Sequence, residues 1–287
     1  MVTSARSMID MHGPALSISP PNSGKDDGMR MKWIVMLVGV FASGAILTGR
    51  AGERGIQLVV TVEARRLAGA DVSEQIARII QTLLPGGRAD VTYVTDGKAV
   101  RGTPSASVFG FEAGVVKLVP AGSVDVYSLN TGNRTYKVVS GNAKPFNAPV
   151  KFHLQPTGRT KTMLGLNARQ VTGWLRVDPP SFPGEQQHIS EVRADIDNWC
   201  TSTITIPPAM SRMMDIVTRI AGGPPDVQYA GTCPLALQSS VRVSVLPGYE
   251  IVSTVTSLRH LAQIPPDTFQ IPAGYRRMST DGTAPGK

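Results

Sequence analysis

The chain has 287 residues, of which 29 are Lys or Arg and 21 are Asp or Glu, so its formal net charge at pH 7 is +8. The basic residues are scattered, and no run of them alternates with aromatic residues as on a nucleic-acid-binding surface, so we expect no nucleic-acid partner. The sequence lacks a P-loop, a dinucleotide-binding glycine motif and a nucleophile elbow, which argues against the common nucleotide-dependent and serine-hydrolase classes.

Residues 29–51 have the pattern of a secretory signal peptide. A short basic stretch precedes fourteen mostly apolar residues, Ile34 to Leu47, and small residues stand before a cleavage point after Ala51. The apolar run is shorter than the about 20 residues of a membrane-spanning helix, so we favour cleavage over retention as an anchor. Cleavage predicts an exported protein, located in the periplasm or outside the cell.

The signal divides the chain into four parts. Residues 1–28 are polar and are either a disordered leader or a mis-assigned start, and residues 29–51 are the signal itself. Residues 52–277 are expected to form a single β-rich domain, followed by a flexible tail at 278–287. The first 51 residues hold five of the basic and three of the acidic residues, so the remainder keeps a net charge of +6.

The first two predicted elements are a strand and a helix. Residues 56–62 are apolar and rich in β-branched residues, which is typical of a strand. In the segment 71–84 the apolar residues instead fall on one helical face, with Asp71 as the expected N-cap and Pro-Gly-Gly at 85–87 as the stop.

The chain then becomes rich in short strands. Asp96-Gly97 and residues 130–133 predict tight hairpin turns. The predicted strands are 91–95, 98–101, 115–119, 124–129, 135–139, 150–154, 163–177, 191–199, 201–206, 241–246 and 251–258.

A second helix is predicted after residue 206. Pro207 and Pro208 suit a first helical turn, and the glycines and prolines at 222–225 end the helix. Many short strands with two helices predict a mainly β (α+β) fold: a curved antiparallel sheet, or incomplete β-barrel, whose apolar face the two helices cover.

The two cysteines, Cys200 and Cys233, are expected to form a disulfide, because an exported protein with two cysteines usually pairs them. Closing a loop of this length stabilises by about 3–4 kcal/mol in the chain-entropy model. A zinc site is disfavoured because no second pair and no nearby histidine accompanies them. The spacing also differs from that of a Cys-x-x-Cys redox pair.

Four segments resemble one known family. They are Val-Thr-Tyr-Val-Thr-Asp-Gly-Lys-Ala-Val-Arg at 91–101, the hairpin at 126–136, Thr-Lys-Thr-Met-Leu-Gly at 160–165 and Pro-Asp-Thr-Phe-Gln-Ile-Pro-Ala-Gly-Tyr at 266–275. The chain resembles a family of exported bacterial domains of unknown function with LolA-like (lipoprotein-carrier-like) architecture. That resemblance implies an incomplete antiparallel barrel, with helices plugging its concave face, and a cavity for an acyl chain or another apolar ligand.

The second helix is the predicted binding element. Methionine is adaptable and suits surfaces that receive irregular apolar ligands. The candidate ligand-lining residues are Met210, Met213, Met214 and Val217. The alternative is that these side chains only pack on the sheet, and both can hold, because a helix in a half-barrel is core and cavity wall at once.

The favoured function is therefore non-enzymatic binding of a lipid or a lipoprotein acyl chain by a monomeric envelope protein, without cofactor or metal. The alternative is a structural or protein-interaction module of the envelope, with a filled core and another envelope protein as its partner. Asp195 and Asp197 share one strand face and could bind a cation or act as the acid–base pair of a third possibility, a hydrolase, but a solvated face explains them better. We accordingly predict no catalytic residue.

Overall fold

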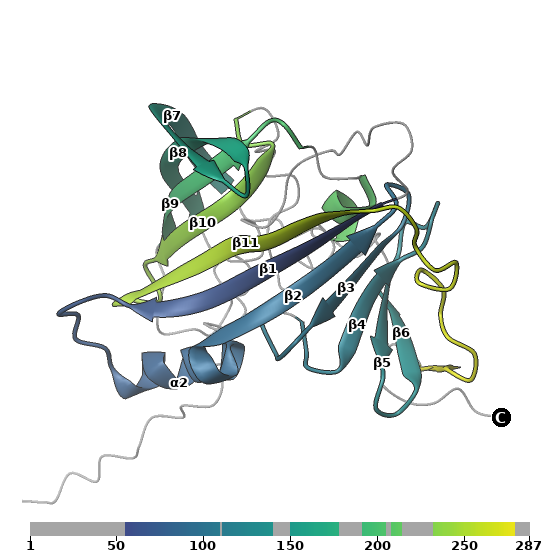
Figure 1. Ribbon diagram of the computed structural model, residues 1–287. Helices are drawn as coiled ribbons and strands as arrows, with labels where there is room; N and C mark the ends of the chain where they lie inside the picture. Colours follow the sequence, from purple (N-terminus) through teal and green to yellow (C-terminus); the bar gives the residue numbers. More distant parts are fainter. Residues whose placement is uncertain are drawn as a thin grey trace, which may run out of the picture.

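Twelve strands form one strongly curved, open sheet in the computed structural model (Figure 1). The structure describes residues 55–109, 111–139, 150–177, 191–204, 208–213 and 232–278. The strands are β1 (Gly55–Arg66), β2 (Arg88–Thr95), β3 (Val100–Pro104), β4 (Val115–Val119), β5 (Val126–Asn130), β6 (Thr135–Val139), β7 (Val150–Met163), β8 (Leu166–Val177), β9 (Val192–Thr201), β10 (Leu235–Val243), β11 (Tyr249–Leu261) and β12 (Arg276–Arg277). The predicted mainly β fold with a curved antiparallel sheet is confirmed.

The order of strands in the sheet is β12-β6-β5-β4-β3-β2-β1-β11-β10-β9-β8-β7. The first and the last long strands, β1 and β11, thus pair in the middle of the sheet, which ties the two ends of the chain together. Neighbouring strands are antiparallel, except that the two-residue strand β12 runs parallel to β6. The hairpin turns expected between β2 and β3 and between β5 and β6 are confirmed.

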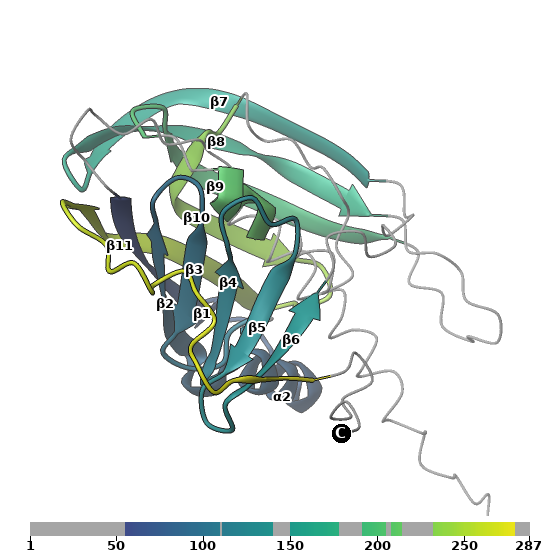
Figure 2. The same cartoon turned by 90° about the vertical axis from the view of Figure 1, so that its right-hand side faces the viewer.

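Side chains alternate between the two faces of each strand, and the face towards which the sheet curves, here called the inner face, is apolar. Leu58, Tyr93 and Gly102 lie side by side on this face, in register on β1, β2 and β3. The two predicted covering helices are present, namely α2 (Glu74–Leu83) and a helix at 208–213 that lies on the inner side of the sheet (Figure 2). Both helices contribute side chains to the one large buried cluster.

The helix α2 starts later than predicted. Its N-cap is Ser73, whose hydroxyl oxygen accepts a hydrogen bond from the backbone N–H of Ile76 at 3.3 Å. The prediction of Asp71 as the cap was wrong, because Ser73 is the residue whose side chain reaches a free backbone N–H of the first turn. The four buried side chains of α2 are Ile76, Ile79, Ile80 and Leu83.

The strands β7 and β8 form one long hairpin where the sequence predicted separate strands at 150–154 and 163–177. The turn is Leu164-Gly165, and both residues have positive φ angles, 51° and 74°. Residues 160–165 are therefore the end of a strand and its turn, rather than the start of a strand. The pairing shifts register between Pro156 and Thr160, and this irregular polar segment has no alternation to predict from.

Two other predicted boundaries also change. The strands predicted at 191–199 and 201–206 are a single strand, β9, which ends at Thr201, and residues 202–204 form bends. The predicted closing hairpin is present, but its first strand, β10, begins at Leu235, before the predicted start at Val241.

Residues 265–275, here called the C-terminal segment, pack on the outer face of the sheet. Phe269, Ile271 and Tyr275 contact the second buried cluster, which consists of Val116, Leu118 and Leu129 on β4 and β5. Gly274 has a φ of 84°, and the N–H of Tyr275 donates to the carbonyl oxygen of Pro272 at 3.3 Å, which closes a turn. Both faces of β4 are consequently buried.

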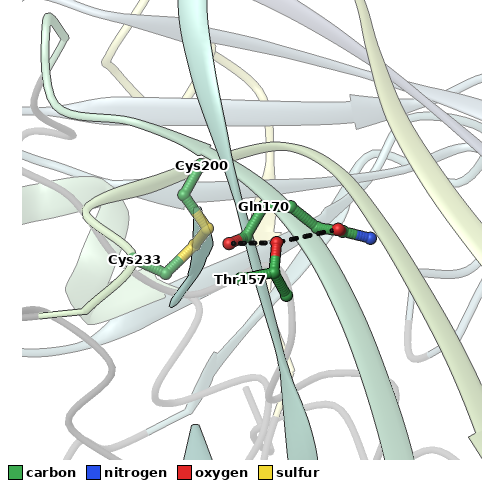
Figure 3. Close-up of a disulfide and its surroundings, with 4 residues drawn as sticks. All are labelled: Thr157, Gln170, Cys200 and Cys233. Atoms are coloured by element: carbon green, nitrogen blue, oxygen red, sulfur yellow. Dashed lines mark hydrogen bonds between the residues drawn. A yellow bond between two sulfur atoms is a disulfide. The ribbon is translucent and has the colours of Figure 1, made fainter. Parts of the chain in front are cut away.

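The predicted disulfide between Cys200 and Cys233 is present, with Cα atoms 5.2 Å apart (Figure 3). It joins the end of β9 to the segment before β10, and the helix at 208–213 lies between the two cysteines in sequence. Beside it, Thr157 of β7 donates a hydrogen bond to the side-chain oxygen of Gln170 of β8 at 3.0 Å. A disulfide is consistent with an oxidising, exported compartment.

The predicted leader and signal, residues 1–51, lie outside the described residues, as do residues 279–287 of the predicted tail. In the described ranges, no helix combines the length and the hydropathy required to cross a membrane.

Candidate ligand-binding site

The two described methionines of the second helix, Met210 and Met213, are buried on the inner face of the sheet, with 3% and 0% of their surface exposed. Met214 and Val217, the other two predicted lining residues, lie outside the described residues. Met213 reaches the sheet where Gly102 leaves room for it. A Cβ atom built on Gly102 would lie 3.3 Å from the Met213 sulfur, so a larger residue would crowd this contact.

Two aromatic rings flank Met213 at this position. The Cβ atom built on Gly102 would also lie 3.1 Å from the ring of Tyr93 and 3.2 Å from that of Phe111. These two rings meet edge to face, with centroids 6.1 Å apart and an interplanar angle of 86°. Burial raises the pKa of the Tyr93 phenol far above its ordinary value, so the phenol stays neutral.

The next residue of this row on the inner face is charged. Lys117 of β4 lies opposite Gly102 of β3 and opposite Ser128 of β5 in the sheet register. Only 8% of Lys117 is exposed, and its ammonium group donates a hydrogen bond to the Ser128 hydroxyl at 2.9 Å. Burial lowers the pKa of Lys117 below its ordinary value, and the carboxylate of Glu112 partly opposes this shift.

A second polar pair lies on the inner face at the other end of the sheet. Asn198 of β9 and Ser239 of β10 are directly opposite each other in the register and are 3% and 2% exposed. The side-chain oxygens of both residues are buried and have no hydrogen-bond partner in the part of the chain that the structure describes. Most buried polar side-chain atoms in proteins are hydrogen-bonded, so two orphaned oxygens on adjacent strands are unusual.

The outer face of the same strands has a different chemistry, because its polar groups are paired with one another. Asp195 accepts two hydrogen bonds from the Arg193 guanidinium, and Asp197 accepts hydrogen bonds from the Gln170 amide at 2.9 Å. The prediction that the two aspartates share one face is confirmed, and both have protein partners. Throughout the described ranges, no group of three or more His, Cys, Asp or Glu is arranged to hold a metal ion.

A surface pocket of about 510 Å³ lies on the outer face, between β3 and the C-terminal segment. Arg101 of β3 and Asp267, Thr268 and Gln270 supply its polar lining, and the Arg101 guanidinium donates to the carbonyl oxygen of Thr268 at 3.4 Å. This pocket is on the opposite side of the sheet from Met210 and Met213. It is therefore not the acyl cavity that the family resemblance implies.

The sequence analysis missed Lys117, Ser128, Asn198 and Ser239. The sequence of β4, Val-Val-Lys-Leu-Val, could have indicated Lys117, because it places a single lysine among four apolar residues. Asn198 and Ser239 carried no such signal, because only the pairing of β9 with β10 brings them together.

Comparison with known proteins adds little at this point. No family model and no curated protein matches the sequence. A LolA superfamily protein from Nitrosomonas europaea aligns over 83% of this chain and 97% of its own, with 7% identity and a TM-score of 0.29. A structure of PNGF-II aligns over 77% of this chain and 30% of its own, with 11% identity and a TM-score of 0.34. Similarity at this level assigns neither a family nor a function, so the function is argued from the residues.

Proposed function

We propose that this protein binds an apolar ligand, such as a lipid or an acyl group, against the inner face of its curved sheet. The observation that carries the proposal is the pair of unpartnered oxygens of Asn198 and Ser239, buried on that face. Leaving a buried polar atom without a hydrogen bond costs about 1–3 kcal/mol. A hydroxyl or ester group of a ligand placed beside these two side chains would supply the missing hydrogen bonds.

The surroundings of this pair select a mainly apolar ligand. Val171 of β8 is opposite Asn198 on the same face, and Ile196 and Val241 are the next inner-face residues along β9 and β10. All three are buried. An apolar surface with a few placed polar groups is the usual composition of a small-molecule site.

The proposal places this binding protein outside the cytoplasm, after removal of the signal. The disulfide and the signal pattern at 29–51 support this location. Met214 and Val217 remain proposed as further lining residues, next to Met210 and Met213.

The second candidate is a structural or protein-interaction module with a filled core. The complete burial of Met213 beside Gly102 favours it, because this side chain fills space in the core between the helix and the sheet. The two candidates differ in one property: a filled core binds no lipid, whatever the conditions of purification.

Ser239→Ala and Ser240→Ala test the proposal as a matched pair, since these neighbours point to opposite faces of β10. Ser240 donates a hydrogen bond to Glu250 at 2.6 Å on the outer face, whereas the Ser239 hydroxyl has no partner among the described residues. We expect Ser239→Ala to weaken ligand binding about 2- to 10-fold, the equivalent of one hydrogen bond, without loss of stability. Ser240→Ala should leave binding unchanged and destabilise the protein by about 1 kcal/mol.

The measurements are native mass spectrometry of the gently purified protein and titration with a fluorescent fatty acid. A co-purified lipid, or saturable uptake of the probe that Ser239→Ala weakens, would support the proposal. A protein that carries no lipid and takes up no probe would overturn it in favour of the filled core.

A further inference from the structure

We infer that the ligand of the inner face carries an anionic group, a carboxylate or a phosphate, which the Lys117 ammonium and the Ser128 hydroxyl bind. This inference rests on the proposed function, because it assigns the polar end of the same ligand.

The position of Lys117 follows from the strand register. Leu58, Tyr93, Gly102, Lys117 and Ser128 are opposite one another in sequence across β1 to β5, so they form one row on the inner face. The sulfur of Met213 lies against the Gly102 member of that row. Lys117 therefore directly follows the apolar and aromatic part of the row, Leu58, Tyr93 and Gly102, and its neighbour Gly102 is the position that the predicted binding helix contacts.

Among the residues that the structure describes, no carboxylate lies at contact distance from the Lys117 ammonium. The Lys117 ammonium donates a hydrogen bond to the neutral Ser128 hydroxyl, which uses one of its three N–H groups. Glu112 is exposed and acts on Lys117 from a longer range, without an ion pair between them. A lysine that is buried almost completely is normally paired with a carboxylate.

The missing partner is therefore an anion of ligand size. A carboxylate or phosphate oxygen beside the ammonium would take up its remaining protons, and the Ser128 hydroxyl, which is half-buried, would donate to a second oxygen. The lowered pKa of Lys117 in the free protein fits this picture, since it reports burial that no nearby carboxylate compensates.

Lys137 gives an internal control. It is opposite Ser128 on β6, so it belongs to the same row and the same face, but it is exposed. A solvated lysine gains little from an ion pair, whereas a buried one gains much more. Removal of the charge at these two neighbouring positions should therefore have very different effects on an anionic ligand.

The experiment measures displacement of a fluorescent fatty acid from the mature, disulfide-bonded protein by oleic acid, methyl oleate and oleoyl lysophosphatidic acid. Lys117→Met should weaken binding of the two anions about 10- to 100-fold, as expected for loss of a charge-assisted hydrogen bond, and leave methyl oleate unchanged. Lys137→Met should change all three by less than about 2-fold. If Lys117→Met does not fold, Lys117→Gln serves as the second variant.

The outcomes separate the two proposals. If none of the three lipids displaces the probe, or the probe itself does not bind, the proposed function fails. If all three bind with equal affinity to the wild type and to Lys117→Met, lipid binding stands and the anionic-group inference fails. Preference of the wild type for oleate or for lysophosphatidic acid supports the inference and identifies the anion as carboxylate or phosphate.

Discussion

Two lysines on opposite faces of the sheet, Lys117 and Lys161, are surrounded very differently. The Lys161 ammonium lies 4.0 Å from the centre of the Trp199 ring and donates to the side-chain oxygen of Gln238 at 2.8 Å. Asp197 adds electrostatic attraction, which partly opposes the lowering of the Lys161 pKa by burial. Lys117 is more deeply buried, yet among the described residues its one hydrogen-bond partner is the hydroxyl of Ser128.

The difference separates a structural cluster from an incomplete one. On the outer face, the aromatic ring, the amide and the carboxylate around Lys161 satisfy the charge within the protein. On the inner face, Lys117 keeps unused hydrogen-bonding capacity, just as Asn198 and Ser239 do. Asn198, Ser239 and Lys117 all lie on the face that two helices cover, which is where a ligand would complete their hydrogen bonds. Among the described residues, the outer face has one buried nitrogen without a hydrogen bond, the Nε of Arg176, but this atom lies 3.5 Å from the Glu191 carboxylate.

The largest expected effect comes from the disulfide, which lies at the same end of the sheet as Lys161, among β7 to β10. The disulfide links Cys200 at the end of β9 to Cys233 before β10. Replacing both cysteines by serine removes this cross-link from the unfolded chain, so it should destabilise the protein by about 3–4 kcal/mol. Chemical denaturation measures the loss, and hydrogen exchange should speed up in β9 and β10 before it does in β4 and β5. Equal acceleration of hydrogen exchange in both pairs of strands would show that the two ends of the sheet do not unfold separately.

Met213→Ala should have the next largest effect, and it changes the inner face next to the row that contains Lys117. Because Met213 is fully buried against Gly102, its truncation is expected to cost about 2–4 kcal/mol of unfolding free energy without ligand. Met163→Ala is the matched control: Met163 is half-buried at the end of β7, so its loss should be clearly smaller. Similar losses from both changes would contradict the tight packing of the covering helix.

The two lysines should respond to replacement by methionine with opposite signs. Lys117→Met removes a buried charge that has no counter-ion among the described residues, so it should stabilise the unliganded protein by about 1–2 kcal/mol. Lys161→Met removes a cation that packs on Trp199, so it should destabilise the protein by about 0.5–1 kcal/mol. Thermal denaturation of both variants measures the signs, and loss of stability in Lys117→Met would show that Ser128 already satisfies the charge.

The gain from Lys117→Met should also depend on pH. The pKa of Lys117 is lower in the folded than in the unfolded chain, so the folded state loses its proton first as the pH rises. The wild type therefore gains stability between the folded pKa and the ordinary lysine pKa of about 10.4, above which the cost of burying the charge disappears. The advantage of the variant is fully present below the folded pKa and fades as the pH approaches that upper value.

Much of the fold could be predicted from the sequence, because its signals are local. Apolar residues recur with a period of 3.6 in 71–84 and with a period of 2 in the strands, which predicted α2 and the curved sheet. Asp96-Gly97 predicted a turn, and in the structure the Asp96 carboxylate accepts hydrogen bonds from the N–H groups of Lys98 and Ala99 there. The long strand β7 was harder, since its register shift after Pro156 interrupts the alternation on which a prediction depends.

The candidate site was less predictable, because it depends on pairing between distant strands. Met213 was proposed because the predicted second helix is rich in methionine, but its contact with Gly102 depends on how the helix packs on the sheet. Lys117 and Ser128 are eleven residues apart, and Asn198 and Ser239 belong to strands separated by the second helix. The register that makes each pair adjacent is set by the whole sheet.

The irregularity in β7 also has a consequence for self-association. β7 is the last strand in the sheet order and is fourteen residues long, which is a length that invites another chain to add a strand by intermolecular pairing. Pro156 offers no N–H to such a neighbour, and the register shift that follows it bends the edge. This break in the edge strand would thus hinder the pairing of a second chain along the whole length of β7.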